Sequence, residues 1–228
     1  MDLVTDIRNK LVHRLKQNEF VQGTVEIVGA NFLADEETIF GALNQSYISR
    51  ELSWYLSQSL FVDDIPDGAP KIWKQIASHH GEINSNYGYL MHSTKNGDQL
   101  TKVVDCLISD PESRRAVAVY TRPSIHEDWN RDGMADFICT NAVQYLIRNN
   151  KLHVVVQMRS NDAIFGYRND YAWQKYMQEI IIAMLAAANL EVYEGDIIWN
   201  VGSLHVYKRH FWLLEEYAAT GKFDLSLT

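Results

Sequence analysis

The spacing of apolar residues predicts one long amphipathic helix over residues 171–188. Apolar side chains recur there three, four, seven and eight positions apart, which is the period of one helix face. We expect Asn169 or Asp170 to cap the start of this helix and Asn189 to close its end. The apolar face, which we expect to lie mostly in the core, comprises Trp173, Tyr176, Met177, Ile180, Ile181, Met184, Leu185 and Ala188.

Shorter patterns predict further helices over residues 3–16 and 42–56, and several β-rich runs predict strands. Two of these runs flank Asn149-Asn150, which predicts a tight hairpin because asparagine tolerates a positive φ. The mixture predicts an α+β fold with antiparallel pairing. No stretch is biased enough to be a linker, so we expect one domain over residues 1–228. The predicted strands cover residues 24–32 (interrupted by Gly29), 115–120, 142–148, 152–158, 197–201 and 205–207.

Composition places the chain among globular proteins with a sizeable core. It has 228 residues, of which 46% are hydrophobic and 22% charged, so we exclude disorder. Acidic residues outnumber basic ones by 29 to 21, which argues against a broad nucleic-acid-binding face but leaves a local arginine cluster open. The start of the chain lacks a signal-peptide core, and no apolar run approaches the roughly 20 residues of a membrane span. We therefore expect a cytoplasmic protein.

The two cysteines are candidates for different roles. Cys106 lies in an apolar helical setting that favours a structural thiol, whereas Cys139 lies where a loop enters a predicted strand. A nucleophile needs nearby positive charge to favour its thiolate, so Cys139 taken alone fits either a buried thiol or a nucleophile. The sequence has no four-ligand Cys/His pattern for zinc, and we expect no metal.

Arginines next to serines form a candidate phosphate site. Ser113-Arg114-Arg115 precedes one predicted strand, and Arg159-Ser160 ends another. Guanidinium forks and a serine hydroxyl suit the oxygens of a phosphate monoester. The polar segment that follows, residues 161–171, leads into the longest helix. The alternative for this segment is a loop with a helix cap, in which Asp170 serves only the backbone.

A set of motifs in a particular order resembles the thymidylate synthase superfamily. Arg159-Ser160-x-Asp162-x-x-x-Gly166 is the central motif, with Cys139 twenty residues upstream. Within the superfamily, the sequence is similar to the deoxycytidylate (dCMP) hydroxymethylases of T-even bacteriophages. The other matching segments are residues 51–56, 72–73, 81–88, 113–115, 136–137, 139–141, 143–148, 168–176 and 199–207.

The resemblance implies an α+β fold with a large mixed sheet and packed helices, in a homodimer whose sheets pack against each other. It implies a pyrimidine 2′-deoxynucleoside monophosphate as substrate and 5,10-methylenetetrahydrofolate as the carbon donor. Arg114 and Arg115 would reach into the partner's active site. A phage source would place the protein in the host cytoplasm.

Asp170 is the residue that distinguishes the substrate base. Thymidylate synthases that act on deoxyuridylate have an asparagine at the position of Asp170. An amide offers a donor to O4 and an acceptor to N3–H of uracil, whereas cytosine has an amine at C4 and a bare N3. A carboxyl group can accept from the amine and, when protonated, donate to N3. The aspartate therefore favours cytosine, because the wrong base leaves buried polar groups unpaired.

The resemblance also implies the chemistry. C5 of cytosine is a poor nucleophile, and addition of the Cys139 thiolate to C6 makes it enamine-like. Glu51 would manage protons through ordered water. Water attack on the exocyclic methylene gives 5-hydroxymethyl-dCMP. The remaining implied roles are phosphate binding by Arg114, Arg115, Arg159 and Ser160, hydrogen bonding of the sugar 3′-hydroxyl by His205 and Tyr207, and folate placement by Ile72, Trp73 and Asp162.

Two alternatives to a dCMP hydroxymethylase stay open. Hydride transfer from the folate would make the protein a dCMP 5-methyltransferase with the same residues. A non-catalytic nucleotide- or RNA-binding homologue is the other alternative, and the joint presence of Cys139, Glu51 and the arginines argues against it. One departure concerns the early loop, residues 18–23, which contains no cation where thymidylate synthases usually supply one to the phosphate.

Overall fold

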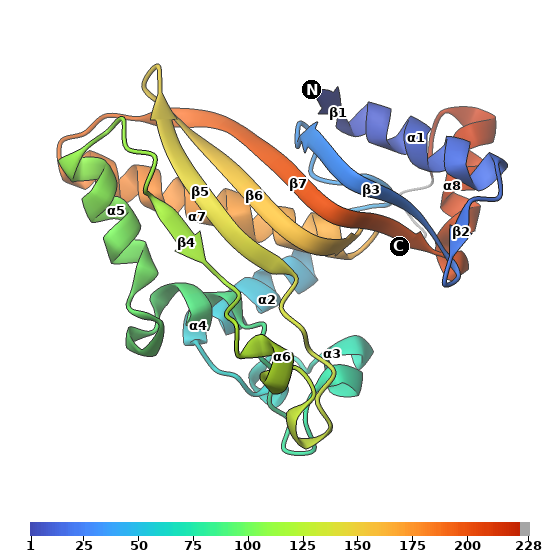
Figure 1. Cartoon of the computed structure of the whole chain (residues 1–228), viewed down its shortest axis with the longest axis horizontal. Coiled ribbons are helices and arrows are strands. Elements are labelled where there is room, and N and C mark those ends of the chain that lie inside the picture. The colour runs from blue at the N-terminus through green and yellow to red at the C-terminus, as the bar shows by residue number, and fades with distance from the viewer. Residues whose placement is uncertain (224–228) are drawn as a thin grey trace.

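A single mixed sheet organises the chain, and a computed structural model describes residues 1–223 of it. The seven strands run in the order β1-β3-β7-β6-β5-β4, with β2 paired to β3 (Figure 1). An α+β fold with a large mixed sheet is therefore confirmed. The strands are β1 (Asp2–Leu3), β2 (Phe20–Val21), β3 (Thr24–Leu33), β4 (Val117–Val119), β5 (Thr140–Arg148), β6 (Lys151–Asp162) and β7 (Tyr193–Tyr207).

The pairing departs from the expected antiparallel pattern in two places. β6 runs parallel to β7, and β1 runs parallel to β3. The long helix between β6 and β7 returns the chain to the end of the sheet where β6 began, which is how parallel neighbours are connected. The two late strands predicted over residues 197–201 and 205–207 are one continuous strand, β7.

The β5–β6 turn and the interruption of β3 at Gly29 follow the local sequence as predicted. β5 and β6 form an antiparallel hairpin whose turn residues Asn149 and Asn150 have φ values of 51° and 58°. Asparagine tolerates this left-handed region better than most residues, because its side chain bonds locally. Gly29 has φ of 69° and interrupts the pairing of β3 with β7 between Val28 and Ala30.

The helices agree with the predicted patterns in kind and differ at their boundaries. The longest one, α7, begins at Gly166 instead of Tyr171, and no side chain caps it. The expectation that Asn169 or Asp170 caps this helix is therefore wrong, since both lie inside it. Asp162 instead accepts backbone N–H bonds from Ile164 and Phe165 in the preceding turn, and this lets the helix start earlier.

The structure also contains shorter helices that the periodicity did not predict. The α-helices are α1 (Val4–Lys16), α2 (Gln45–Ser57), α3 (Lys71–Ile76), α4 (Tyr87–His92), α5 (Gln99–Ser109), α6 (Ile125–Asp128), α7 (Gly166–Ala187) and α8 (Phe211–Thr220). Single turns of 3₁₀ helix cover Val62–Asp64, Thr94–Asn96, Arg131–Gly133 and Lys208–His210. At the end of α7, Asn189 adopts φ of 63°, as a residue that closes a helix does.

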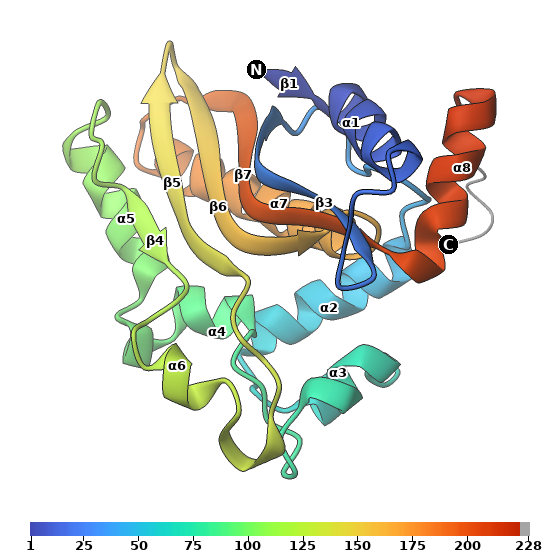
Figure 2. The ribbon, with the colours of Figure 1, turned by 45° about the vertical axis from the view of Figure 1, so that its right-hand side comes forward.

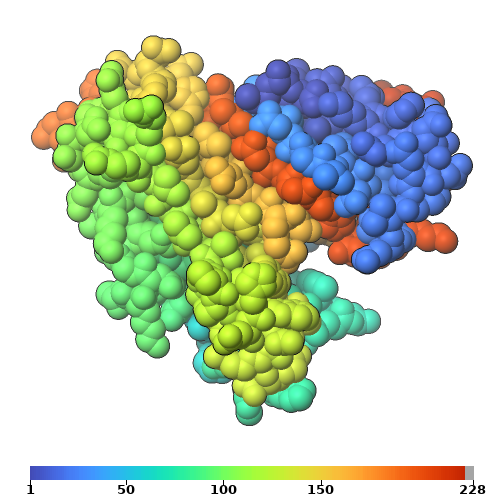
Figure 3. Space-filling view, viewed as in Figure 1, coloured from blue at the N-terminus to red at the C-terminus, as the bar shows by residue number. Residues whose placement is uncertain are grey.

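Helices cover one face of the sheet and leave most of the other open. α7 lies behind β5, β6 and β7 in Figure 1, and the turned view in Figure 2 shows α2 on the same side. On the open face, strands remain visible between α5 and α1 in the space-filling view (Figure 3). Trp173, Met177, Ile181 and Leu185 of α7 are fully buried, which confirms its predicted core face at these positions. None of the helices within residues 1–223 is long and apolar enough to cross a membrane.

Candidate active site

Cys139 lies at the end of the sheet, directly before β5, and Arg159 of β6 lies beside it. The Arg159 guanidinium is 3.5 Å from the Cys139 sulfur and also donates to the Phe137 and Ile138 carbonyls at 2.5 and 3.1 Å. Burial raises the pKa of the Cys139 thiol to about 11, with the charge of Arg159 acting in the opposite direction. The resting cysteine is therefore a thiol at neutral pH, and the Arg159 guanidinium is already placed to stabilise a thiolate.

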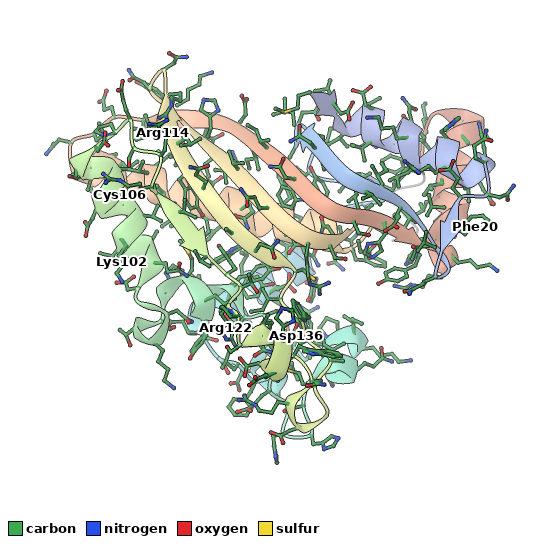
Figure 4. All side chains as sticks on the ribbon, viewed as in Figure 1. Phe20, Lys102, Cys106, Arg114, Arg122 and Asp136 are labelled. Carbon is green, nitrogen blue, oxygen red and sulfur yellow. The ribbon has the colours of Figure 1, made fainter. Side chains whose placement is uncertain are left out.

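Asp136 anchors the loop that leads into Cys139. Its buried carboxylate accepts bonds from the backbone N–H groups of Asn84 and Ser85 and from the Ser85 hydroxyl, at 2.6–2.8 Å. Arg122 braces the same region by donating to the Asn84 side chain at 3.1 Å, and Figure 4 places Arg122 and Asp136 close to each other. Sequence reasoning assigned these residues no role, although the likeness over residues 81–88 and 136–137 marked both partners.

Asp170 is half-buried in the first turns of α7, within reach of residues from three other elements. The Asn161 side-chain amide of β6 donates to Asp170 Oδ2 at 2.7 Å. Trp199 of β7 donates its indole N–H to the carbonyl oxygen of the same amide at 3.2 Å. Burial, with a contribution from the Glu51 charge, raises the pKa of Asp170 to about 8, and hydrogen bonding to Asn161 and Tyr87 partly offsets this. Asp170 is therefore mostly a neutral carboxylic acid at pH 7.

Glu51 lies in the middle of α2 with two hydrogen-bond donors on one oxygen. The Tyr47 hydroxyl donates to Glu51 Oε1 at 2.5 Å, and the Trp73 indole N–H is 3.3 Å from the same atom. Burial raises the pKa of Glu51 to about 7, against the effect of both donors. Tyr47 was missed by sequence reasoning beyond its place on an apolar helix face, although its i,i+4 spacing to Glu51 predicts contact.

The end of β7 brings His205 and Tyr207 to the same region as Arg159. The His205 and Tyr207 rings lie 4.9 Å apart, and His205 pairs in register with Asp162 of β6. The Tyr207 hydroxyl is near enough to Cys139, Asp162 and Arg159 for their charges to affect its pKa, which burial raises. Arg209, a cation that sequence reasoning did not single out, lies 4.4 Å from the centre of the Tyr207 ring.

Arg114 and Arg115 are the predicted site residues that one chain does not bring to Cys139. Both are exposed, and the Arg115 side chain is 83% exposed, with Asp110 at 4.0 Å as an ion-pair partner. Figure 4 shows Arg114 near the hairpin end of the sheet, whereas Asp136, close to Cys139 in the sequence, lies at the opposite end.

The remaining predicted residues are close to the site or on its margin. Trp73 of α3 is half-buried and donates to the Tyr47 hydroxyl at 2.8 Å, which places it beside Glu51. Its neighbour Ile72 is 58% exposed. Cys106 is half-buried on α5, and its thiol lies 3.3 Å from the Ser113 hydroxyl. Among residues 1–223, no group of three or more His, Cys, Asp or Glu side chains could hold a metal ion.

The fold and this arrangement of residues agree with the comparison of the sequence with protein-family models. The thymidylate synthase family model matches residues 2–225, so the chain belongs to the thymidylate synthase family. Within this family, the sequence is similar to two curated phage proteins. The chain is 53% identical to the deoxycytidylate 5-hydroxymethyltransferase of Enterobacteria phage T4 over 98% of this chain and 94% of that protein. It is 54% identical to the enzyme of the same name from Enterobacteria phage T6, over 96% and 92% of the two chains.

Solved structures of more distant sequence share the fold. The thermostable thymidylate synthase A from Bacillus subtilis superposes with a TM-score of 0.72, covering 97% of this chain and 86% of that one at 22% identity. The thymidylate synthase from T4 phage gives a TM-score of 0.66 at 23% identity, covering 85% and 71%. At these identities the comparison concerns the fold alone, and it confirms the predicted thymidylate synthase-like architecture.

Proposed function

We propose that this chain is a deoxycytidylate 5-hydroxymethylase, which adds a one-carbon unit and water to C5 of dCMP. The observation that supports this most directly is the half-buried Asp170 carboxyl near Cys139, which accepts a bond from Asn161 and has its pKa raised to about 8 by desolvation. A neutral carboxyl offers one donor and one acceptor, which is the pattern that N3 and the C4 amine of cytosine require. The identity to phage deoxycytidylate 5-hydroxymethyltransferases points to the same base.

Cys139 is the proposed nucleophile. Its sulfur forms a bond to C6 of the base as the thiol proton leaves, and electron density moves to C5. The Arg159 guanidinium, 3.5 Å from the sulfur, stabilises the thiolate that attacks. The resting thiol has its pKa raised to about 11, so substrate binding must favour the thiolate or a base must remove the proton.

The one-carbon donor is proposed to lie between Glu51 and the α3 helix. Trp73 is half-buried and Ile72 is exposed there, and an indole face with an adjacent aliphatic side chain suits a flat pterin ring. When bound, 5,10-methylenetetrahydrofolate supplies the carbon that C5 attacks. Asp162 is proposed to help place it, while its carboxylate also caps the turn before α7.

Glu51 is the proposed group for proton transfer. Its pKa of about 7 means that both protonation states are populated near neutral pH, as general acid–base catalysis requires. After C5 forms its new carbon–carbon bond, loss of the C5 proton would expel tetrahydrofolate from the transferred carbon as its bond to the folate nitrogen breaks, and an exocyclic methylene would remain on the base. Water adds to this methylene carbon, and departure of the Cys139 sulfur from C6 restores the aromatic base as 5-hydroxymethyl-dCMP.

The substrate phosphate and sugar are proposed to bind along the ends of β6 and β7. Arg159 and Ser160 would hold phosphate oxygens, and His205 with Tyr207 would bond the 3′-hydroxyl. The short distance between the His205 and Tyr207 rings and their proximity to Arg159 support one continuous nucleotide site.

We also propose a homodimer in which the open faces of two sheets pack together. That face presents apolar side chains, of which Val28 is 75% and Val119 is 53% exposed, next to half-buried Leu146, Val155 and Ile198. An open apolar face of this kind is typical of an interface. Packing would bring Arg114 and Arg115, remote from Cys139 in their own chain, toward the phosphate site of the partner.

Mass spectrometry of the reaction product tests the proposed function. Purified protein is incubated with dCMP and 5,10-methylenetetrahydrofolate, with Cys139→Ala as the matched control. A gain of one oxymethylene unit on dCMP supports the hydroxymethylase. A gain of one methylene unit, with dihydrofolate formed, would make the chain a dCMP 5-methyltransferase instead. Absence of any product would favour a non-catalytic binding protein.

A further inference from the structure

A chain of two hydrogen bonds, from the Trp199 indole to the Asn161 amide and from that amide to Asp170, holds the Asp170 carboxyl in place. Asn161 is 3% exposed and Trp199 is fully buried. The order is Trp199 N–H to Asn161 oxygen at 3.2 Å, then Asn161 N–H to Asp170 Oδ2 at 2.7 Å. The three residues come from β7, β6 and α7 in turn.

The indole decides which way the Asn161 amide points. An indole nitrogen can only donate, so the atom of Asn161 that faces it must be the carbonyl oxygen. The NH₂ group of the same amide then faces Asp170 Oδ2. Rotating the amide by half a turn would place two donors against each other inside the protein, and an unpaired buried donor costs about 1–3 kcal/mol.

The amide in turn assigns different roles to the two oxygens of Asp170. Oδ2 receives an N–H bond, so a proton on the neutral carboxyl is favoured on Oδ1. Resting on the proposed function, we propose that Asn161, oriented by Trp199, is a positioning residue that sets the donor and acceptor order of Asp170 toward the cytosine base. Oδ2 then remains the acceptor for the C4 amine, and Oδ1–H is the donor to N3.

Gly166 leaves the space that this arrangement needs. A Cβ at Gly166 would lie 3.0 Å from the Asn161 side-chain nitrogen and 3.8 Å from Asp170 Oδ2. The same Cβ would lie 3.3 Å from Asp162 Cβ, and no positive φ is required, so the position is restricted by the close approach of Asn161 and Asp162. A glycine at the start of α7 thus leaves room for the Asn161 amide that donates to Asp170.

Other ionisable groups surround Asp170 and act on its titration. Glu51 and Asp162 disfavour its charged form, and Tyr87 bonds to it. Removal of the Asn161 donor removes an effect that favours the carboxylate, so the pKa of Asp170 rises further from about 8. The groups that face Asp170 from the packed elements are Glu51 and Tyr55 of α2, Tyr87 of α4, Tyr120, Cys139 and Asp162.

The test compares three variants in which a buried polar group is removed. Trp199→Phe keeps an aromatic ring, although a smaller one, and removes the donor that orients the amide, whereas Asn161→Leu removes the amide. Trp54→Phe is the matched control, because Trp54 is equally buried and donates its indole N–H to the Phe61 carbonyl at 3.1 Å, with no bond to Asp170. Each variant is assayed for the ratio of kcat/KM on dCMP to that on deoxyuridylate. The ionisation of Asp170 is followed separately by ¹³C NMR of labelled aspartate, with Asp170→Asn identifying the signal.

We expect the dCMP preference to fall about fivefold or more in Trp199→Phe and Asn161→Leu, the effect of one lost buried hydrogen bond. The NMR midpoint of Asp170 should move to higher pH in Asn161→Leu, and both readouts should stay at their wild-type values in Trp54→Phe. A ratio and midpoint in Trp199→Phe equal to those of Trp54→Phe would overturn the role of the pair, even if Asn161→Leu does not fold. If the wild type makes no product from dCMP, the proposed function fails, and the NMR titration still decides whether Asn161 controls Asp170.

Discussion

The candidate site has two parts whose surroundings differ. We call the residues around Asp170 the base-reading half and the residues around Cys139 the nucleophilic half. Around Asp170, a single chain supplies every partner, and Asn161, Trp199 and Tyr87 are all buried. Around Cys139, the partners are fewer and the cation is Arg159, which remains exposed and bonds mainly to backbone carbonyls. The proposed base-reading half therefore has its partners within one chain, whereas the proposed nucleophilic half would take Arg114 and Arg115 from the partner chain.

This difference suggests separate roles, in which the surroundings of Asp170 set base specificity and the surroundings of Cys139 set reactivity. A buried network costs little to reorganise when substrate binds, so it can discriminate between bases through the pairing of each polar group. A thiol with its pKa raised to about 11 is unreactive until its surroundings change. In the proposed mechanism, a Cys139 that stays protonated until substrate binds would be protected from unproductive reactions.

The largest expected effect is on the nucleophilic half. Cys139→Ser should retain dCMP binding and lose turnover by at least about a thousandfold, because a serine hydroxyl without an activating base is a far poorer nucleophile. Release of tritium from C5 of labelled dCMP measures the chemical step, and equilibrium dialysis measures binding. Tritium release at a near-normal rate would remove Cys139 from its proposed role.

A mixing experiment tests whether the nucleophilic half is completed by a second chain. Arg114→Ala and Cys139→Ser should each be almost inactive, and subunit exchange should restore activity. Random 1:1 mixing makes half of the dimers mixed, each with one intact site of two, so about a quarter of wild-type activity is expected when interfaces are symmetric. Exchange is verified by mass spectrometry of differently tagged chains. No recovery after proven exchange would contradict a shared site.

In the base-reading half, Asp170→Asn should move the kcat/KM ratio from dCMP toward deoxyuridylate by at least about tenfold, since an unpaired buried group costs about 1–3 kcal/mol. The amide offers a donor where the C4 amine needs an acceptor. Asp170 lies inside α7 and does not cap it, so a role limited to helix capping no longer explains the residue. Both substrates are compared on wild type and variant, and an unchanged ratio would exclude base reading by Asp170.

The ionisation of Asp170 should also appear in substrate binding. Its pKa is raised to about 8, so the protonated form that fits cytosine is abundant at pH 7 and scarce at pH 9. In a Cys139→Ser background, the Kd for dCMP should weaken about tenfold between pH 7 and pH 9 by linkage. Asp170→Asn in the same background should lose this dependence. Titration calorimetry at a series of pH values makes the measurement, and an identical pH dependence in both proteins would assign it to another group.

The two halves also differ in how far the sequence predicted them. Local patterns sufficed for the β5–β6 hairpin and for Cys139 at the entry to β5, because asparagine turns and loop-to-strand transitions are encoded by neighbouring residues. The bond from Trp199 to Asn161 was not predictable in this way. It depends on the parallel pairing of β6 with β7, which only the crossover through α7 determines.

The motif resemblance named candidate site residues but did not predict the contacts that hold their side chains in place. Asp170, Glu51 and Trp73 were singled out from the motifs, yet the burial of Glu51 and its contact with Trp73 come from the packing of α2 and α3. The start of α7 was misplaced because Asp162 supplies bonds that a search for a cap near Tyr171 does not consider.

The smallest expected effect concerns Tyr47, which connects Glu51 to Trp73. Its hydroxyl donates to Glu51 at 2.5 Å and lowers a pKa that burial has raised to about 7. Tyr47→Phe removes this donor, so the Glu51 pKa rises and a smaller fraction of Glu51 is ionised at pH 7. The smaller ionised fraction should lower kcat at pH 7 by up to about fivefold. Little change is expected at pH 9, where Glu51 is ionised in both proteins.

Tyr176→Phe on α7, with no contact to Glu51, is the control. Between pH 5 and 9, the acidic limb of the kcat profile should move to higher pH in Tyr47→Phe and stay in place in the control. A uniform loss of kcat at every pH would instead indicate that Tyr47 supports the packing of α2 and does not tune Glu51.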